Sequence, residues 1–169
     1  MRYLTLVSIL LVGACSGEAE QPKAAAPKAS AIQAGQWETT TEVTRLTQKD
    51  QGTPKINTPA GTKSTASLCI GEGEVKKPAP ALFAGSEGEC AYDNFYMSGG
   101  TLNVTMRCTR PGLSGEVLVS ADGDYSADSL TANVETSTHL ATDGDVVIAA
   151  KMTGRHVGPC TAAPEEKSA

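Results

Sequence analysis

Apolar and polar residues alternate strictly along much of the second half of the chain. From Leu102 to Cys108 every second residue is apolar, and polar residues fill the positions between. A period of two is typical of a β-strand that buries one face. The pattern returns at 130–139, so both segments are predicted to be strands. The residues expected on one face are Leu102, Val104, Met106 and Cys108 in the first strand, and Leu130, Ala132, Val134, Thr136 and Thr138 in the second.

The segment from Cys90 to Cys108 is predicted to form one β-hairpin. Two alternating runs flank Ser98-Gly99-Gly100, and glycine readily takes the positive φ angle that a tight turn requires. A register folded about Gly99 opposes three pairs, which are Cys90 with Cys108, Tyr92 with Met106, and Asn94 with Val104. Because opposed residues on one face have Cβ atoms about 4.5–5.5 Å apart, this register predicts a disulfide between Cys90 and Cys108.

Turn residues divide the rest of the chain into further short strands. We expect these strands at 35–46, 64–70, 114–121 and 146–155. The expected turns are Pro111-Gly112, Asp122-Gly123-Asp124 and Thr142-Asp143-Gly144-Asp145. Residues 48–62 are predicted to be a polar loop. Residues 71–88 are irregular, and only 79–84 suit a helical turn.

Short strands separated by turns about every ten residues indicate an all-β antiparallel meander. With about seven or eight strands, curling into a barrel-like or sandwich shape would best cover the edges. One domain at 34–160 suits a chain of 169 residues. Trp37, the only tryptophan, is expected in the core or as a plug, although a sugar platform is the alternative. The aromatic residues expected to fill the space around the hairpin are Phe83, Tyr92, Phe95 and Tyr96.

Residues 1–14 are predicted to be a signal peptide rather than part of the fold. Met1-Arg2-Tyr3 is a short basic start, Leu4–Val12 is apolar, and Gly13-Ala14 supplies small residues before a cleavage site. This apolar run is shorter than the roughly 20 residues that a membrane-spanning helix needs. Val12-Gly13-Ala14-Cys15 resembles the bacterial lipobox, so Cys15 is expected to be acylated. An ordinary signal peptide with an incidental cysteine is the alternative.

Acylation of Cys15 would anchor the chain in a membrane, because more than one acyl chain makes a stable anchor. Ser16 in the second mature position is typical of outer-membrane sorting. The expected location is therefore the periplasmic face of the outer membrane, with a soluble periplasmic protein as the fallback. Residues 15–33, rich in Ala, Pro, Lys and Glu, are predicted to be a flexible tether, and 161–169 a loose tail.

The chain has five cysteines, an odd number for an exported protein. Assigning Cys15 to lipid leaves an even set for an oxidising compartment. Once the hairpin pairs Cys90 with Cys108, Cys69 is left to pair with Cys160, which would tie an early strand to the last one as partial barrel closure requires. The rival is a four-cysteine zinc site. It is disfavoured because no two of these cysteines lie within four residues of each other.

Several short motifs together resemble a known family. They are Gly35-Gln36-Trp37-Glu38, the segment Ser67-Leu68-Cys69-Ile70, the middle cysteine pair, and Gly154-Arg155-His156-Val157-Gly158-Pro159-Cys160. In this order they resemble the bacterial exported family catalogued as domain of unknown function 3617, over about residues 34–160. Members usually carry Pro-Gly before the tryptophan strand, where this chain has Ala34-Gly35. The resemblance implies an exported protein or lipoprotein and no particular activity. The family-motif residues are Gly35, Trp37, Glu38 and Gly158.

No motif in the chain names a reaction. Gly112-Leu113-Ser114-Gly115 lacks the nucleophile-elbow spacing, and neither His139 nor His156 lies in a zinc-protease frame. Both histidines are expected at the surface or packed near the chain end. The two Asp-Gly-Asp turns lack the other ligands of a calcium loop. A formal net charge of -5 disfavours a nucleic-acid partner. We therefore expect no catalytic residue, metal or cofactor.

The function expected from these observations is that of a non-catalytic, membrane-anchored periplasmic lipoprotein that binds a small apolar ligand or an envelope component. The alternative is an inhibitor or envelope-maintenance protein that acts by protein–protein contact, similar to the small β-barrel lipoproteins that inhibit lysozyme. In that case a protruding loop, 48–62 or 72–89, would carry the contact. A hydrolase is disfavoured. An internal cavity would favour ligand binding, whereas a filled interior would favour protein contact.

Overall fold

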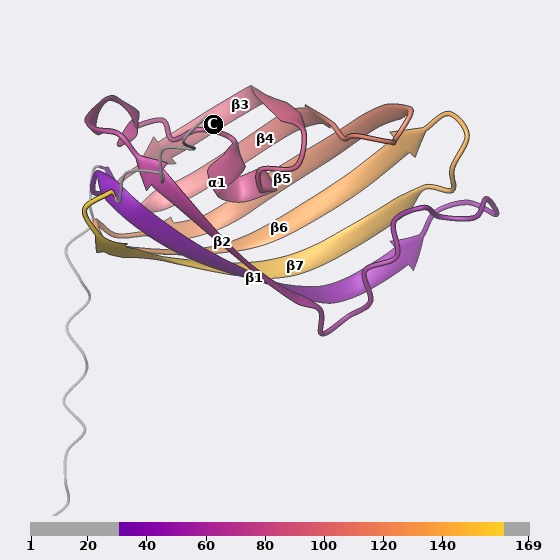
Figure 1. Cartoon of the computed structure of the whole chain (residues 1–169), viewed down its shortest axis with the longest axis horizontal. Coiled ribbons are helices and arrows are strands. Elements are labelled where there is room, and N and C mark those ends of the chain that lie inside the picture. The colour runs from indigo at the N-terminus through magenta and orange to yellow at the C-terminus, as the bar shows by residue number, and fades with distance from the viewer. Residues whose placement is uncertain (1–30, 161–169) are drawn as a thin grey trace, which may run out of the picture.

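The computed structural model describes residues 31–160, which form a single antiparallel β-sheet of seven strands (Figure 1). The strands are β1 (Gly35–Gln48), β2 (Lys63–Ile70), β3 (Glu89–Ser98), β4 (Thr101–Thr109), β5 (Gly115–Tyr125), β6 (Ser129–Leu140) and β7 (Val146–Gly158). Helical structure in these residues is limited to the 3-10 turn η1 (Glu72–Glu74) and the helix α1 (Ala81–Ala84). The all-β prediction is confirmed. The predicted signal peptide, Cys15, most of the predicted tether and the tail 161–169 lie outside the described residues.

The strand order is β2-β1-β7-β6-β5-β4-β3. From β3 to β7 each strand pairs with its neighbour in sequence, as the predicted meander requires. The first strand joins this meander beside the last one, with Gln36 opposite Gly158. Strands β2 and β3 are consequently the two edges of the sheet.

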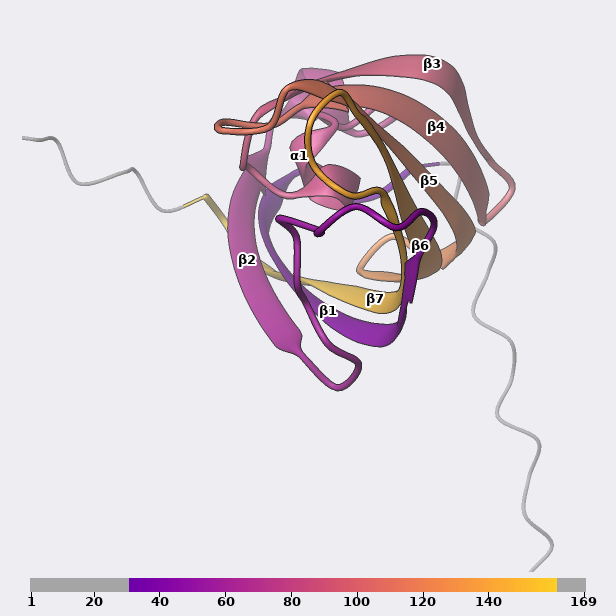
Figure 2. The ribbon, with the colours of Figure 1, turned by 90° about the vertical axis from the view of Figure 1, so that its right-hand side faces the viewer.

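The sheet curls around its concave face but does not close into a barrel. Figure 2 looks along the curl and shows α1 inside it, between the edge strands β2 and β3. A sandwich would need a second sheet, whereas all seven strands belong to one. The segment between β2 and β3 crosses the opening and buries Leu82 and Phe83 of α1. Packing of α1 therefore covers apolar surface that a closed barrel would cover with strands.

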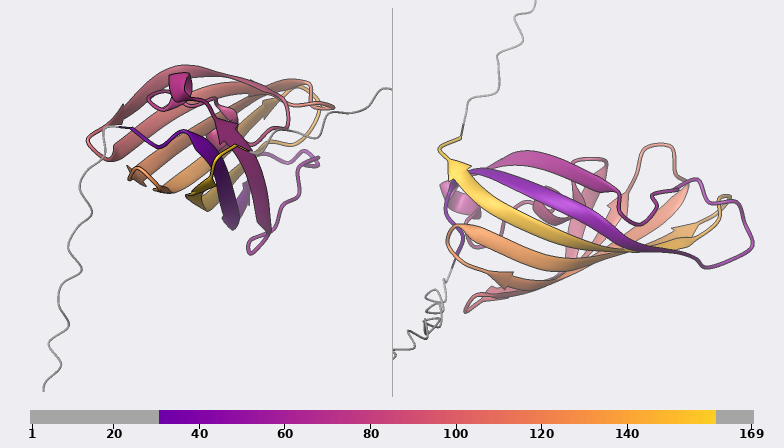
Figure 3. Two further views of the ribbon diagram at one scale, coloured as in Figure 1. Left: turned by 60° about the vertical axis from the view of Figure 1, so that its left-hand side comes forward. Right: turned by 90° about the horizontal axis from the view of Figure 1, so that it is seen from below.

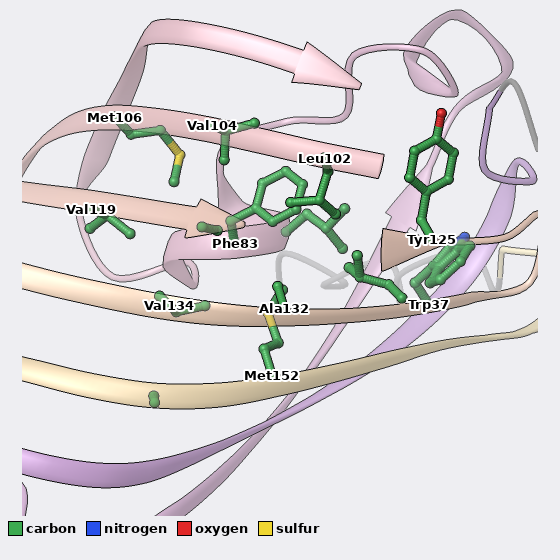
Figure 4. Packing of buried hydrophobic residues seen from close by; sticks show 14 of the residues in the cluster. Trp37, Phe83, Leu102, Val104, Met106, Val119, Tyr125, Ala132, Val134 and Met152 are labelled. Atoms are coloured by element: carbon green, nitrogen blue, oxygen red, sulfur yellow. The ribbon is translucent and has the colours of Figure 1, made fainter. Parts of the chain in front are cut away.

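One end of the concave face is a packed hydrophobic core. Trp37 is fully buried there, as expected, and clusters with Leu102, Tyr125 and Leu130 (Figure 4). Figure 4 also shows Phe83 reaching from α1 toward the inner face of the sheet. Burial in β4 alternates strictly, which confirms the predicted inward face. The inward positions of β6 are likewise the predicted ones, from Leu130 to Thr138.

A β-bulge at Asp93 changes the predicted register of the hairpin. Gly99 and Gly100 both have positive φ angles and form a two-residue turn, so Val104 lies opposite Phe95. The predicted pairing of Asn94 with Val104 is therefore wrong. A register shift between Tyr92 and Asn94 then restores the two other predicted pairs, Tyr92 with Met106 and Cys90 with Cys108.

The bulge also decides which hairpin side chains point inward. Tyr92 and Phe95 are three residues apart, yet both pack against the core, with ring centroids 4.9 Å apart. This agrees with their predicted role as filling around the hairpin. Tyr96 was expected with them, but it lies on the outer face and is 53% exposed. That expectation was wrong because the extra residue reverses the alternation beyond Asp93.

The predicted turn at Asp122-Gly123-Asp124 is also wrong, because these residues continue β5. The turn lies instead at 126–128, where Ser126 Oγ accepts hydrogen bonds from the backbone N–H groups of Asp128 and Ser129. Gly123 has ordinary extended backbone opposite Ala132. A Cβ atom on Gly123 would collide with the backbone at Thr131. Glycine is therefore needed at this position for the close approach of two strands in a curled sheet, and not for a turn.

Both predicted disulfides are present, Cys90–Cys108 and Cys69–Cys160. Cys69 lies on β2, Cys160 lies two residues beyond the end of β7, and β1 runs between these two strands. The second bridge therefore links the two neighbours of β1 at the end of the sheet where β1 begins. The expectation that it would help to close a barrel was wrong, because it does not join the edges β2 and β3.

Candidate functional site

The concave face is open at the end opposite Trp37, where a cavity of about 780 Å³ lies. Its floor consists of Val117, Thr136 and Ile148, which face inward from three adjacent strands, β5, β6 and β7. Small-molecule sites in proteins measure about 300–1,000 Å³. The cavity is therefore large enough for a small ligand, and its floor is mostly apolar.

A second cavity, of about 190 Å³, continues from the first one beneath α1. Thr58, Thr136 and Ile148 line both cavities, so the two are contiguous. Phe83 from α1 and Met152 from β7 are among the apolar side chains that line the inner cavity. Strands β1 and β2, beside β7 in the sheet, contribute mostly small and hydroxyl-bearing residues, namely Thr39, Thr41, Val43, Ser64 and Ala66. We refer to the two cavities together as the groove. Its mouth is the open end of the larger cavity, which is lined by Lys55, Glu87 and Arg110.

The predicted polar loop at 48–62 forms one wall of the mouth. Lys55 Nζ donates a hydrogen bond to the carbonyl oxygen of Gly112, 2.6 Å away in the β4–β5 turn. The backbone N–H of Gly144 donates to the carbonyl of Thr53 at 3.0 Å. Ile56, the residue after Lys55, adds an apolar side chain to the lining. Figure 2 shows this loop in front of the open end of the curl, and Figure 1 shows that it also extends beyond the strand ends there.

Arg110 holds the wall that faces this loop. Its Nη1 donates to the carbonyl of Glu87 at 2.5 Å, and its Nη2 donates to the carbonyl of Ala84 at 2.7 Å. The Arg110 side chain is only 20% exposed, whereas the Glu87 carboxylate, 3.9 Å away, belongs to a side chain that is 90% exposed. Arg110 thus positions the chain after α1, and one water-exposed carboxylate balances its charge poorly.

The family-motif residues lie at the other end of the sheet. Gly35 is buried beside His156, and Trp37 Nε1 donates to the carbonyl of Gln33 at 2.9 Å. The carboxylate of Glu38 accepts a hydrogen bond from Arg155 across β1 and β7. His156 packs edge-on against Trp37 with ring centroids 6.0 Å apart, and its Nε2 lies 3.1 Å from the carbonyl of Ala34. Gly158 opposes Gln36 where β7 ends.

A protein family model described as "Protein of unknown function (DUF3617)" matches residues 32–160, which is most of the chain. The chain belongs to this family. The resemblance drawn from the short motifs is thereby confirmed. Comparison with curated proteins and with solved structures gave no match. The family description assigns no activity.

In this DUF3617 chain the family-motif residues have structural roles. They build the joint at which the first strand meets the last one, and none of them lines the groove. The Cys69–Cys160 disulfide covers the same joint. Trp37 is accordingly a core residue, and the alternative role as an exposed sugar platform does not fit a side chain with no exposed surface.

Replacing Gly35 with alanine should destabilise the fold by about 1–3 kcal/mol. Gly35 has a φ angle of +132°, and a Cβ atom there would meet the carbonyl of Gly158 and the His156 ring. Gly61→Ala is the matched control, because Gly61 also has positive φ but has no atom within 4 Å of the added Cβ. Urea denaturation would measure both variants. Equal losses in the two would show that the close packing at Gly35 contributes nothing.

The two histidines, the candidates for catalysis or zinc binding, do not lie close to each other in the structure. His139 is exposed on β6 opposite Glu116, whereas His156 lies at the Trp37 end. Among residues 31–160 no three His, Cys, Asp or Glu side chains are grouped so that they could hold a metal. The Tyr92 hydroxyl donates to the carbonyl of Pro78 at 2.8 Å, and burial raises its pKa above the ordinary value. No helix in this part of the chain is long and apolar enough to cross a membrane.

Sequence reasoning did not find the residues that line the groove. Thr136 was placed correctly on an inward face, but periodicity does not tell whether an inward side chain meets a core or a cavity. Lys55 and Arg110 lie in segments without periodicity. The sequence signals for these groove residues were weak. Ile56 lies beside Lys55 in an otherwise polar loop, and Arg110 directly precedes the Pro111-Gly112 turn.

Proposed function

We propose that this domain is a non-catalytic binding protein that holds the apolar part of a small amphiphilic molecule in its groove. The observation that carries this proposal is the cavity of about 780 Å³ with a floor of Val117 and Ile148, which continues beneath α1. Water in such a groove is released when an apolar chain enters, and each buried methylene contributes about 0.8 kcal/mol. The large, mostly apolar opening distinguishes this end from the packed Trp37 end.

The position of the groove also suits a domain tethered through a lipid on Cys15, which we propose as its attachment to the periplasmic face of the outer membrane. The domain begins and ends at the same end of the sheet, since Gln36 opposes Gly158. The loop 48–62 follows the far end of β1, a strand of 14 residues. At about 3.3 Å per residue the mouth lies roughly 45 Å from the start of the domain. Figure 3 shows this separation from below. A tether at the start of the domain would leave the mouth unobstructed.

The alternative function, inhibition through protein contact, has less support from the loops. Residues 72–89 contain α1, which is buried against the sheet through Leu82 and Phe83. The loop 48–62 is held across the mouth by Lys55 and Thr53. A lysozyme assay remains the direct test, and clear inhibition would favour this alternative over ligand binding.

Filling the groove should weaken ligand binding strongly without unfolding the protein. We suggest Thr136→Phe, because Thr136 lines both cavities. Glu135→Phe is the matched control, since Glu135 is the neighbouring residue on the exposed face of the same strand. The probe is N-phenyl-1-naphthylamine, an uncharged apolar fluorophore, added to the full chain carrying Cys15→Ser. We expect saturable binding that weakens about tenfold or more, roughly 1.4 kcal/mol, in Thr136→Phe and not in Glu135→Phe.

Circular dichroism would show that both variants keep their β structure. Absence of saturable binding in the parent chain, or equal binding by Thr136→Phe, would show that the groove is not a ligand site.

A further inference from the structure

The charged groups that line the mouth of the groove are predominantly positive. They are Lys55, Arg110 and Glu87. Glu87 is the one carboxylate among them, and its 90% exposed side chain points into water. Hydration and salt screen a carboxylate in that position, so it offsets the two cations only weakly. The mouth therefore carries a formal charge of about one positive unit, which is complementary to a monoanion.

Lys55 has unused hydrogen-bonding capacity at this mouth. Its ammonium group has three N–H donors, and the hydrogen bond to the carbonyl of Gly112 uses one of them. Within residues 31–160 no carboxylate oxygen lies within 4.0 Å of Lys55 Nζ. Arg110 also keeps unused N–H donors, but its Nη1 and Nη2 donate to the carbonyls of Glu87 and Ala84, and its side chain is only 20% exposed. Lys55 is exposed and makes one hydrogen bond, so it is the cation better placed to contact a ligand, and Arg110 adds positive potential from a fixed position.

The neighbours of Lys55 give the direction in which a ligand would lie. Ile56, next in sequence, lines the same cavity, and Ile148 and Val117 form the floor behind it. Thr58 belongs to both cavities, so this lining continues from the mouth to the space beneath α1. A molecule with its charge at Lys55 would therefore place an apolar chain along the floor and its far end near Phe83.

We propose that the groove is specific for an aliphatic monocarboxylate, whose headgroup binds Lys55 at the mouth and whose chain lies along the floor. This inference rests on the proposed function, because it concerns the same groove, and adds the class of ligand. A single carboxylate matches the net charge of the mouth, and its two oxygens can accept the two remaining N–H groups of Lys55. A neutral alcohol of equal length would keep the apolar contacts but lose this ionic contact.

Competition between matched amphiphiles tests the proposal. Decanoate, decan-1-ol and decyl phosphate would each displace N-phenyl-1-naphthylamine from the full chain carrying Cys15→Ser at pH 7. We expect decanoate to bind about five- to tenfold more tightly than decan-1-ol. Lys55→Gln should remove this preference, leave decan-1-ol binding within about twofold, and flatten the salt dependence of decanoate binding. Lys55→Arg should keep most of the preference. Lys151→Gln, on the exposed face of β7, is the control and should change nothing.

The possible failures of this inference differ from those of the proposed function. If the fluorophore does not bind at all, the proposed function is wrong. If the fluorophore binds but decanoate and decan-1-ol compete equally, the groove binds apolar chains and the carboxylate inference is wrong. Tighter binding of decyl phosphate than of decanoate, or a decanoate preference that survives Lys55→Gln, would also overturn it. A groove occupied by a second copy of the chain would appear as fluorophore binding that decreases as a dimer forms at higher protein concentration.

Discussion

Removal of the Cys69–Cys160 disulfide is expected to lower the free energy of unfolding by about 4–5 kcal/mol, because the bridge closes a long loop. The two cysteines are 91 residues apart, whereas Cys90 and Cys108 are separated by 18. In the chain-entropy model the shorter bridge contributes about 3 kcal/mol. The longer bridge also holds an exposed edge strand, because β2 is paired on one side only.

Cys69→Ala combined with Cys160→Ala would test this expectation by urea denaturation, with Cys90→Ala combined with Cys108→Ala for comparison. Alanine is preferred to serine because Cys108 is buried and a hydroxyl there would add a second cost. Hydrogen exchange should show the earliest loss of protection in β2 when the longer bridge is absent. A smaller loss of stability for the longer bridge than for the shorter one would contradict the loop-entropy account.

Replacement of Trp37 with alanine should cost about 3–5 kcal/mol, the range found for large aromatic residues in packed cores. Trp37 is fully buried, packs edge-on against His156, and donates a hydrogen bond to the carbonyl of Gln33. Truncation would leave a cavity and an unpaired backbone carbonyl at the joint between β1 and β7. Both losses add to the same destabilisation.

Tyr96→Ala is the control for Trp37→Ala, because Tyr96 is an aromatic residue that is 53% exposed on the outer face. We expect it to change the free energy of unfolding by no more than about 0.5 kcal/mol. Chemical denaturation monitored by circular dichroism suits both variants, since Trp37 is the only tryptophan and its fluorescence is lost on replacement. A loss below about 1 kcal/mol for Trp37→Ala would show that this end of the sheet is not a well-packed core.

The two disulfides show how local and non-local information combine in this protein. The pairing of Cys90 with Cys108 was predicted from a turn centred on Gly99, but the turn contains both Gly99 and Gly100. A two-residue turn with an unbroken ladder would set Cys90 opposite Thr109, on the outer face. The bulge at Asp93 adds the one residue that brings Cys90 opposite Cys108. The predicted pair was correct because the one-residue error in the turn was cancelled by the one-residue bulge, which the prediction had also left out.

Some of the architecture was determined by sequence alone. Alternation identified the strands and the inward face of β4, because side chains in a strand point to opposite sides whatever surrounds it. The order of motifs and cysteines also identified the family and the disulfide pairing, within the residues that the structure describes. These are properties of neighbouring residues or of fixed positions, so no knowledge of the tertiary fold was needed.

The tertiary structure alone decided the position of β1 beside β7, the bulge, the continuation of β5 through Gly123, and the groove. Each depends on what packs against an element from elsewhere in the chain. Thr136 and Leu130 are both inward positions of β6, yet the hydrophobic core buries Leu130 while Thr136 lines an open groove. A periodic pattern reports which way a side chain points. Whether it meets another side chain, a loop or an empty space is set by non-local packing.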